Sequence, residues 1–303
     1  MDNAKSAETK SKSAGEDRRQ PGRHVILTLS CDDRPGIVAA VAGNIAGNGG
    51  NIVESAQYGD GESGRFFMRV RFELLQPVSL DELKERMQPV ARAYDMEWGL
   101  TDAAAPSRVL ILVSRFDHCM NDLLYKTRIG ALPMQVVGVA SNHRDFADRI
   151  AAEGYDFYHL PITPETKAEQ EAKLLSLVEE TGAELVVLAR YMQILTDETA
   201  RALTGRAINI HHSFLPSFKG ARPYQQAHRR GVKLIGATAH YVTGDLDEGP
   251  IIEQETERVD HSMTADELVA VGRDIECRVL ARAVKFHVER RVLLNGSRTV
   301  VFR

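Results

Sequence analysis

The sequence predicts an α/β protein with two domains. The smaller one has the order β-α-β-β-α-β, and the larger one has a doubly wound, mostly parallel sheet. The small domain is indicated by residues 23–101, where short alternating strands flank two helical stretches. The large domain is indicated by residues 108–303, where continuous apolar runs alternate with helical segments. A chain of 303 residues is long enough to bury two separate cores.

Composition points to an ordinary globular protein. Hydrophobic residues make up 43% of the chain and charged residues 26%, and the net charge of −4 gives no support for nucleic-acid binding. No apolar run reaches the roughly 18 residues of a membrane span, so we expect no membrane partner. The three cysteines, Cys31, Cys119 and Cys277, are far apart, which favours a reducing compartment and predicts a cytoplasmic protein.

The amino-acid composition changes at two places along the sequence, and these places define the predicted domain boundaries. Residues 1–22 are rich in Lys, Ser, Glu, Ala and Gly and lack an apolar segment, which predicts a disordered tail rather than a secretory signal. Residues 102–107 combine small side chains with a proline, as a linker does. The two domains are therefore expected to cover residues 23–101 and 108–303.

The first domain carries the periodicities of four strands and two helices. The strands are predicted at 24–30, 51–56, 66–72 and 96–101, and the helices at 37–45 and 80–94. The third strand alternates apolar residues with arginines, so one face is packed and the other is charged. These residues are Phe66, Met68, Val70 and Phe72 on one face and Arg65, Arg69 and Arg71 on the other. Phe67 interrupts the charged face and predicts a partner surface there, and the whole order is the ferredoxin-like plan.

Two short stretches of this domain resemble the ACT domain, a regulatory module that often binds amino acids at paired interfaces. They are Asp33-Arg34-Pro35-Gly36-Ile37-Val38 and Gly49-Gly50-Asn51-Ile52. The resemblance implies glycine or methionine as effectors, bound by Asp33, Arg34, Gly36 and Asn51, and a homo-oligomer built through ACT domains. A helix that starts at Gly36 offers backbone N–H groups to a carboxylate. The alternative is that Pro35 and Gly36 only shape a turn and that the domain only dimerises.

The second domain alternates buried strands with helices. Apolar runs predict strands at 109–113, 136–140 and 185–189, with helices around 119–128, 146–153 and 167–181. A strand at 207–211, a helix near 224–230, strands at 234–241 and 250–257 and one long last helix follow. Thr264 and Glu267 form a capping box at the start of that helix, and its apolar stripe marks Cys277 as structural. The pattern predicts a doubly wound α/β sheet.

The residues that can carry chemistry concentrate where the strand at 207–211 ends. Asn209 and His211 share one face of that strand because side chains alternate, and open α/β sheets bind their ligands at strand ends. The loop Gly244-Asp245-Leu246-Asp247-Glu248-Gly249 supplies carboxylates downstream. An amide, an imidazole and a carboxylate are the groups needed to add a nucleophile to a carbonyl and to hold the resulting oxyanion.

A metal site is one alternative reading of these residues. His211, His212 and Asp247 are metal-ligand types, but adjacent histidines on extended backbone point to opposite faces. They share one ion only if the backbone turns sharply there, and the sequence has no HxH, HExxH or CxxC pair to complete a site. We therefore predict no metal.

A cysteine nucleophile is a second alternative. Cys119 follows His118 at the start of a helix that comes directly after a strand, where a thiol can be activated. The acidic neighbours Asp117 and Asp122 are expected to raise the pKa of that thiol. This disfavours a nucleophilic Cys119.

Three stretches together resemble the folate-dependent formyltransferase family. They are Asn209-Ile210-His211-His212-Ser213-Phe214-Leu215-Pro216-Ser217-Phe218-Lys219-Gly220, Gly236-Ala237-Thr238-Ala239-His240-Tyr241-Val242 and Leu246-Asp247-Glu248-Gly249-Pro250-Ile251-Ile252. The resemblance covers about residues 108–300 and implies that Asn209, His211 and Asp247 are catalytic. It implies 10-formyltetrahydrofolate as substrate and no permanently bound cofactor. The implied substrate-binding residues are Met192, Gln193, Ile194, Leu195, Thr243, Gly244 and Asp245.

Departures from the family pattern favour water as the formyl acceptor. Glycinamide ribonucleotide formyltransferase has a glycine-rich turn that cradles a phosphate, whereas residues 114–122 contain no glycine and two aspartates. Methionyl-tRNA formyltransferase adds a C-terminal domain and a basic surface, whereas this chain is acidic and is expected to end after one long helix.

We therefore predict hydrolysis of 10-formyltetrahydrofolate to formate and tetrahydrofolate, a reaction that would supply formate for purine synthesis. Asn209 and His211 are expected to stabilise the oxyanion, while Asp247 orients the water and relays its proton. Two alternatives stay open: transfer of the formyl group to an amine, and a catalytically silent amino-acid sensor built on the first domain. The parts played by His212 and His240 are also open.

Overall fold

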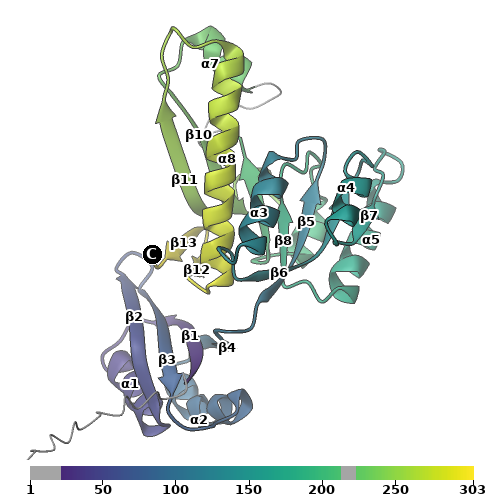
Figure 1. Ribbon diagram of the computed structural model, residues 1–303. Coiled ribbons are helices and arrows are strands. Elements are labelled where there is room, and N and C mark those ends of the chain that lie inside the picture. Colours follow the sequence, from purple (N-terminus) through teal and green to yellow (C-terminus); the bar gives the residue numbers. More distant parts are fainter. Residues whose placement is uncertain (1–21, 213–222) are drawn as a thin grey trace, which may run out of the picture.

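The computed structural model of the chain describes residues 22–212 and 223–303 and shows two α/β domains (Figure 1). The predicted fold class is confirmed, because one sheet has four antiparallel strands and the other has seven mostly parallel strands. The predicted tail up to residue 21 and the Ser213–Gly220 part of the stretch that resembles the formyltransferase family lie outside the described residues.

The first domain has the predicted β-α-β-β-α-β order. Its elements are β1 (Arg23–Asp32), α1 (Ile37–Gly47), β2 (Gly50–Asp60), β3 (Arg65–Leu74), α2 (Leu80–Ala93) and β4 (Glu97–Asp102). The strand order is β2-β3-β1-β4, with every neighbouring pair antiparallel. The apolar face of β3 packs with α1 and α2 into one core. The two helices therefore cover a single face of this sheet (Figure 1).

The other face of this sheet is turned toward the second domain. Arg69 is only 2% exposed, and its guanidinium donates to the backbone carbonyl of Glu289 and to the carboxylate of Glu54. Asn295, also from the C-terminal segment, donates to Asp60 at 2.7 Å. Phe67 is 1% exposed, so the prediction of an open partner surface there is wrong. The sequence alone does not show that this face is covered by the same chain.

The second domain forms the larger sheet and its helices. Its elements are β5 (Ser107–Val113), α3 (His118–Arg128), β6 (Met134–Ser141), α4 (Ala147–Ala152), β7 (Phe157–His159), α5 (Lys167–Glu180), β8 (Leu185–Leu188), α6 (Asp197–Ala202), β9 (Ala207–His211), α7 (Pro223–Arg230), β10 (Leu234–Tyr241), β11 (Ile251–Arg258), α8 (Ala265–Val288), β12 (Val292–Asn295) and β13 (Arg298–Val301). The strand order is β11-β10-β9-β8-β5-β6-β7. The strands from β9 to β7 are parallel, and β10 and β11 are antiparallel to their neighbours.

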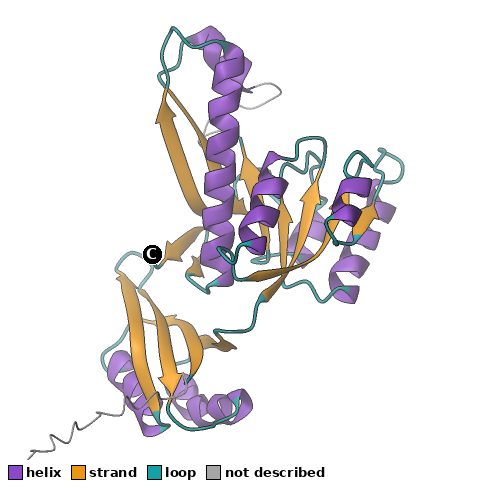
Figure 2. Cartoon of the chain, in the orientation of Figure 1, coloured by secondary structure: helices purple, strands orange, loops and turns teal. Residues whose placement is uncertain are grey.

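Helices cover both faces of the large sheet and create two cores (Figure 2). Side chains of β5 alternate between them: Val109, Ile111 and Val113 enter the core with α3 and α8, while Leu110 and Leu112 enter the core with α5. This division explains why the strand reads as a continuous apolar run, because both of its faces are buried.

The C-terminal end of the chain differs from the prediction. The capping box is present, since Thr264 accepts from the backbone of Glu267 while the Glu267 carboxylate accepts from the backbone of Thr264. However, the chain does not end after α8, because β12 and β13 form an antiparallel hairpin beside the first domain (Figure 1). Two further short elements, β7 and α6, were also not predicted. Four-residue strands are too short to show a reliable period.

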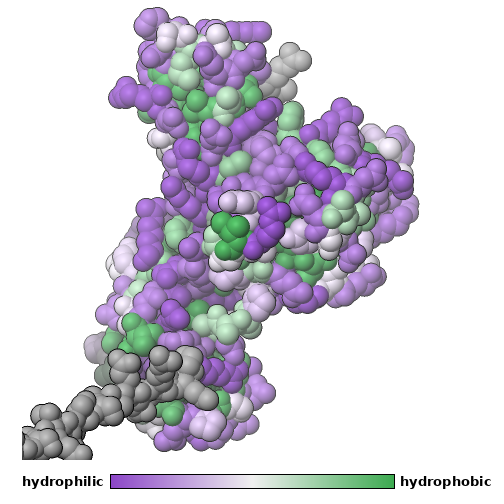
Figure 3. Space-filling view, in the orientation of Figure 1, coloured by the Kyte–Doolittle hydropathy of each residue, from purple (hydrophilic) through white to green (hydrophobic). Residues whose placement is uncertain are grey.

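The visible surface is mostly polar. The face seen in Figure 3 is mainly hydrophilic, and its hydrophobic patches are small and separate. Among the described residues, no helix combines the length and apolarity needed to cross a bilayer.

The buried arginine between the domains gives a stability prediction. Replacing Arg69 with Met leaves the Glu289 carbonyl without its donor and removes one of the two arginines that hold Glu54. We expect a loss of about 3 kcal/mol in the free energy of unfolding, measured by urea titration. The matched variant Arg65→Met removes a more exposed pair with Glu97 and should cost no more than about 1 kcal/mol. Equal losses in the two variants would contradict a special role for Arg69.

Candidate active site

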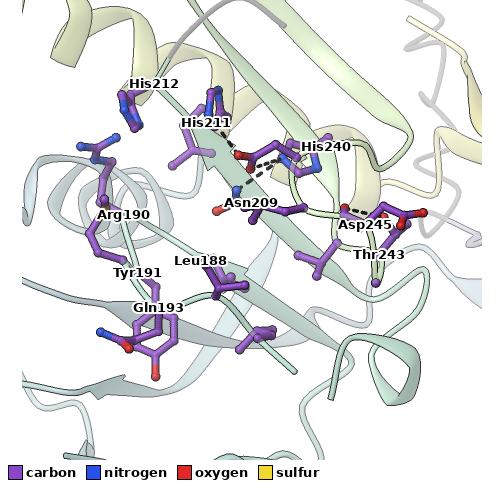
Figure 4. A pocket seen from close by; sticks show the side chains of 18 residues that line it. Leu188, Arg190, Tyr191, Gln193, Asn209, His211, His212, His240, Thr243 and Asp245 are labelled. Atoms are coloured by element: carbon purple, nitrogen blue, oxygen red, sulfur yellow. Dashed lines mark hydrogen bonds and ion pairs between the residues drawn. The ribbon is translucent and has the colours of Figure 1, made fainter. Parts of the chain in front are cut away.

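A cavity of about 330 Å³ lies where β8 and β9 end, beside the loop that joins β10 to β11 (Figure 4). It is lined by Leu188, Arg190, Tyr191, Met192, Gln193, Ile194, Leu195, Asn209, Ile210, His211, His212, His240, Val242, Thr243, Gly244, Asp245, Leu246 and Asp247. All ten residues predicted to be catalytic or substrate-binding are in this lining. The position is the carboxyl edge of the parallel strands, where open α/β sheets bind ligands.

The polar centre of the cavity brings the three predicted catalytic side chains together. His211 Nε2 lies 3.3 Å from Asp247 Oδ2, and His240 Nε2 lies 3.7 Å from Asp247 Oδ1. Asn209 Nδ2 lies 3.3 Å from His240 Nε2. These contacts join the groups into one cluster around the Asp247 carboxylate, and Figure 4 shows Asn209, His211 and His240 close together there.

His240 is a central residue of this cluster, although its role was left open by the sequence analysis. It is 3% exposed, and its Nδ1 lies 2.8 Å from the backbone oxygen of Tyr241. Because a carbonyl oxygen only accepts, Nδ1 must carry the proton. Asn209 Nδ2 lies against Nε2 of the same ring, so His240 fixes the orientation of that carboxamide. The antiparallel pairing of β10 with β9 places His240 directly opposite Asn209.

Asp247 is held as an anion in an unusual backbone conformation. Burial acts to raise its pKa, but hydrogen bonds from His211 and His240 and their charges hold that pKa well below its usual range. Its φ of 58° lies in the left-handed region, which is rare outside glycine. The neighbouring Gly249 is required by close packing, since a Cβ there would lie 1.8 Å from the Tyr241 oxygen. The loop is thus folded tightly onto β10 and presents the carboxylate to the cavity.

The loop after β8 is fixed at both of its ends. The backbone N–H of Met192 donates to Ser114 Oγ at 2.9 Å, and the backbone N–H of Thr196 donates to the buried Glu171 at 2.9 Å. Between these anchors the apolar side chains of Met192 and Ile194 are more than half exposed at the cavity. Leu246 on the facing loop is 56% exposed. Large apolar side chains gathered beside a polar cavity are typical of a ligand site.

The two adjacent histidines do not point to opposite faces, as extended backbone predicted. Their rings stack, with centroids 5.0 Å apart, because β9 ends at His211 and the backbone changes direction there. Burial and the positive charge of Arg190 lower the pKa of His212 to about 4. His212 is therefore neutral at physiological pH and lies behind His211.

A buried ion-pair network closes the end of the cavity beside His212. Arg190 has a φ of 63°, its Nε lies 3.4 Å from Glu276 Oε2, and the guanidinium stacks over Phe116. Glu276 is 1% exposed and also accepts from Tyr224 and pairs with His118 Nε2, each at 2.7 Å. This network could not be predicted from the sequence, because Glu276 lies on an otherwise apolar face of α8.

The geometry favours neither a metal site nor a cysteine nucleophile. Among the described residues, one group of possible metal ligands is close enough to share an ion, and it comprises His118, Cys119 and Glu276. The direct 2.7 Å contact between His118 and Glu276 leaves no room for an ion between those two atoms. The Cys119 thiol is fully buried, and a hydrogen bond with Cys277 together with burial raises its pKa well above the ordinary value. The predicted cause was wrong, since Asp117 pairs with Arg149 instead.

Comparison with known proteins agrees with this geometry. The family model described as "Formyl transferase" matches residues 107–284, and the one described as "ACT domain" matches residues 25–89. The chain is 54% identical over 282 residues to a formyltetrahydrofolate deformylase of Corynebacterium sp. (strain P-1), covering 93% of this chain and 98% of that protein. The crystal structure of formyltetrahydrofolate deformylase from Burkholderia mallei aligns with a TM-score of 0.90 at 54% identity, covering 93% of this chain and 100% of that one.

A transferase of the same fold matches less of the chain. The crystal structure of glycinamide ribonucleotide transformylase 1 from Symbiobacterium toebii aligns with a TM-score of 0.61 at 30% identity, covering 65% of this chain and 95% of that one. The doubly wound sheet and the cavity at its edge thus define a formyl transferase-type domain, here preceded by an ACT domain. The chain belongs to the formyltetrahydrofolate deformylase family.

A buried histidine behind the site gives a pH prediction. The hydroxyl of Tyr241 lies 2.7 Å from His287 Nδ1, and burial together with the charge of Arg290 lowers the pKa of His287 to about 3. Below about pH 6.5 the unfolded chain binds a proton that the folded chain does not, so stability falls as the pH falls. The slope from this group is at most about 1.4 kcal/mol per pH unit.

We therefore expect His287→Phe to flatten the dependence of the unfolding free energy on pH between pH 7 and pH 5, measured by urea titration. The exposed His261 is the matched control, and His261→Phe should retain the full slope. Identical slopes for the wild-type protein and His287→Phe would show that His287 does not stay neutral in the folded state.

Proposed function

We propose that this chain hydrolyses 10-formyltetrahydrofolate to formate and tetrahydrofolate. The observation that supports this most strongly is the convergence of Asn209, His211 and Asp247 on one cavity with apolar side chains at its sides. The relatives named formyltetrahydrofolate deformylase support the same substrate and the same acceptor.

The proposed mechanism assigns one task to each polar group. The pterin binds against the backbone of Met192–Leu195 and of Thr243–Asp247. Asp247, an anion, accepts a hydrogen bond from the water and takes its proton as the water oxygen bonds to the formyl carbon. The Asn209 amide and His211 donate to the oxygen that becomes negative. The proton then passes to the folate nitrogen as the carbon–nitrogen bond breaks, and formate leaves.

Water is favoured over an amine as acceptor by what fills the space beside His212. Arg190, Phe116 and Glu276 pack together there, and His118 and Tyr224 hold the Glu276 carboxylate. An acceptor molecule approaching from this side would have to displace a buried ion pair, which is costly. Water is small enough to reach the formyl carbon without doing so.

The assignment of Asn209 is tested by Asn209→Ala. Loss of one donor to a developing oxyanion costs about 10²–10³ in kcat, so we expect formate release to fall in that range. Affinity for a non-reactive folate analogue should change little, because the pterin is assigned to the two loops. Asn44→Ala, a half-buried asparagine on α1 that donates to the Arg86 carbonyl in the first domain, is the matched control and should keep full activity.

The acceptor is tested by single-turnover assays with and without added amines. Formate release that does not depend on an amine supports hydrolysis, and formylated amine as the main product would contradict it. Full activity of Asn209→Ala would instead remove the oxyanion role while leaving the reaction itself intact. No formate release by the wild-type protein would point to an amino-acid sensor.

We also propose that the first domain binds glycine or methionine through the loop that precedes α1. Gly36 has a φ of 97° and stands at the N-terminus of α1, whose backbone N–H groups suit a carboxylate. Arg34 is 42% exposed in its side chain, stacks over Tyr94 and pairs with Asp95. Asp33 and Asn51 are both exposed. All four predicted effector residues are therefore open to a ligand or to a second copy of the chain.

The edge strand β2 supports association of ACT domains into a homo-oligomer. It has one unpaired edge, and Ile52, Val53 and Tyr58 are exposed apolar side chains on it. An open edge strand with apolar residues readily pairs with another chain. We propose that two copies meet at this edge.

The substitution Val53→Lys tests this association. Val53 lies at the bulge of β2, outside the regular pairing with β3, so lysine is tolerated by the single chain. We expect the molar mass from light scattering to fall in the variant because a charged edge residue blocks strand pairing. Leu75→Lys changes an exposed leucine outside β2 and should keep the wild-type mass. A monomeric wild-type protein, or an unchanged mass in Val53→Lys, would contradict the proposal.

A further inference from the structure

A second cavity, of about 200 Å³, lies between the two domains. One wall is the outer face of the first sheet, and the opposite wall is the end of α8 and the residues that follow it (Figure 1). Its lining is Ile26, Glu54, Arg69, Arg71, Thr101, Asp102, Ala103, Ala105, Pro133, Val288, Glu289, Arg290 and Arg291. None of these residues belongs to the catalytic cavity or to the loop before α1.

The charges of this lining do not balance. It contains four arginines and three carboxylates, which leaves one net positive charge. Each carboxylate is already paired within the protein: Glu54 with Arg69 and Arg291, Asp102 with Arg23, and Glu289 with Arg291. The excess charge must therefore be found on one of the arginines.

Arg71 is the arginine that carries this excess charge. Arg69 and Arg291 pair with Glu54, and Arg290 pairs with Glu184 at 2.7 Å. The side chain of Arg71 makes no hydrogen bond or ion pair with any residue in the described ranges, and its Nε is buried without an acceptor. A partly buried guanidinium without an acceptor costs free energy that an anionic ligand can recover.

We propose that this interdomain cavity binds a small, singly charged carboxylate, with Arg71 as its anchor. A planar carboxylate matches the planar guanidinium and neutralises the one unbalanced charge. Ile26, Ala103 and Val288 offer apolar contact to a short ligand body. A volume of 200 Å³ corresponds to about seven water molecules, which suits a ligand of a few heavy atoms and excludes a nucleotide.

A chain of hydrogen bonds connects this cavity to the catalytic cluster. Val288 and Glu289 line the cavity, and the preceding residue, His287, contacts the Tyr241 hydroxyl at 2.7 Å. The backbone oxygen of Tyr241 accepts from His240, which contacts both Asn209 and Asp247. A ligand that fixes the end of α8 therefore also restrains His240. This coupling rests on the proposed function, whereas the binding itself does not.

The test is equilibrium binding to the full-length protein by calorimetry, with formate, acetate and glycine as carboxylate probes and inorganic phosphate as a separate probe. We expect saturable binding of at least one carboxylate, with a Kd on the order of 1 mM. Arg71→Gln should weaken it about tenfold or more, because a charge-assisted hydrogen bond is lost. Arg71→Lys, which keeps the charge but not the planar fork, should retain part of the affinity. Arg92→Gln, exposed on α2, should bind as the wild type does.

Three results would overturn the proposal: no saturable binding of any carboxylate up to about 20 mM, equal affinity in Arg71→Gln, or binding of phosphate alone. Carboxylate binding that is lost in Arg34→Gln but not in Arg71→Gln would assign the ligand to the loop before α1 instead. Hydrogen exchange gives a readout independent of activity, since bound ligand should slow exchange at residues 240–241 and 287–291. If the wild-type protein released no formate even without an added carboxylate, that result would contradict the proposed hydrolysis but not the binding of a carboxylate in the interdomain cavity.

Discussion

The antiparallel pairing of β10 with β9 is the constraint on which the catalytic geometry depends. The five strands from β9 to β7 run in one direction, so their carboxyl ends lie at one edge. Since β10 runs the opposite way, it sets His240 opposite Asn209 and leaves the sheet near Ile208. The loop that follows folds back tightly at Gly249 and returns Asp247 to the same edge. A slip of one residue in this pairing would turn His240 away from Asn209.

Strain and buried charge are concentrated around the same cavity. Asp247 and Arg190 are two of the four described non-glycine residues with positive φ, and they lie at opposite sides of His211. Each belongs to a separate ion pair, with His211 and His240 on one side and Glu276 on the other. Backbone strain of this kind persists where surrounding contacts over-determine it, and it is common at functional sites. The ion pairs supply those contacts here.

Periodicity predicted most of the elements, because a buried strand and an amphipathic helix impose patterns that are local in sequence. The residues that line the candidate active site were also predictable, since Asn209, His211 and the loop of Asp247 carry a family resemblance. His240 and Glu276 were not predicted. The position of His240 opposite Asn209 depends on strand register over a separation of about thirty residues. The position of Glu276 depends on how α8 packs. Neither feature leaves a local pattern in the sequence. The prediction for Phe67 was wrong for a related reason. The residues that cover this face of the sheet, such as Glu289, come from the far end of the chain.

Helix α8 connects three parts of the molecule that are far apart in sequence. Its 24 residues span about 36 Å, with Glu276 at the closed end of the catalytic cavity and His287 behind β10. The carbonyl of Glu289, the residue directly after the helix, accepts from Arg69 on the first domain. A continuous helix packed on β10 along its length moves as one body, because shifting only its end would break backbone hydrogen bonds inside a buried core. A change at the domain junction therefore has to be carried by the whole helix, and the side chains that it holds against the catalytic strands must move with it.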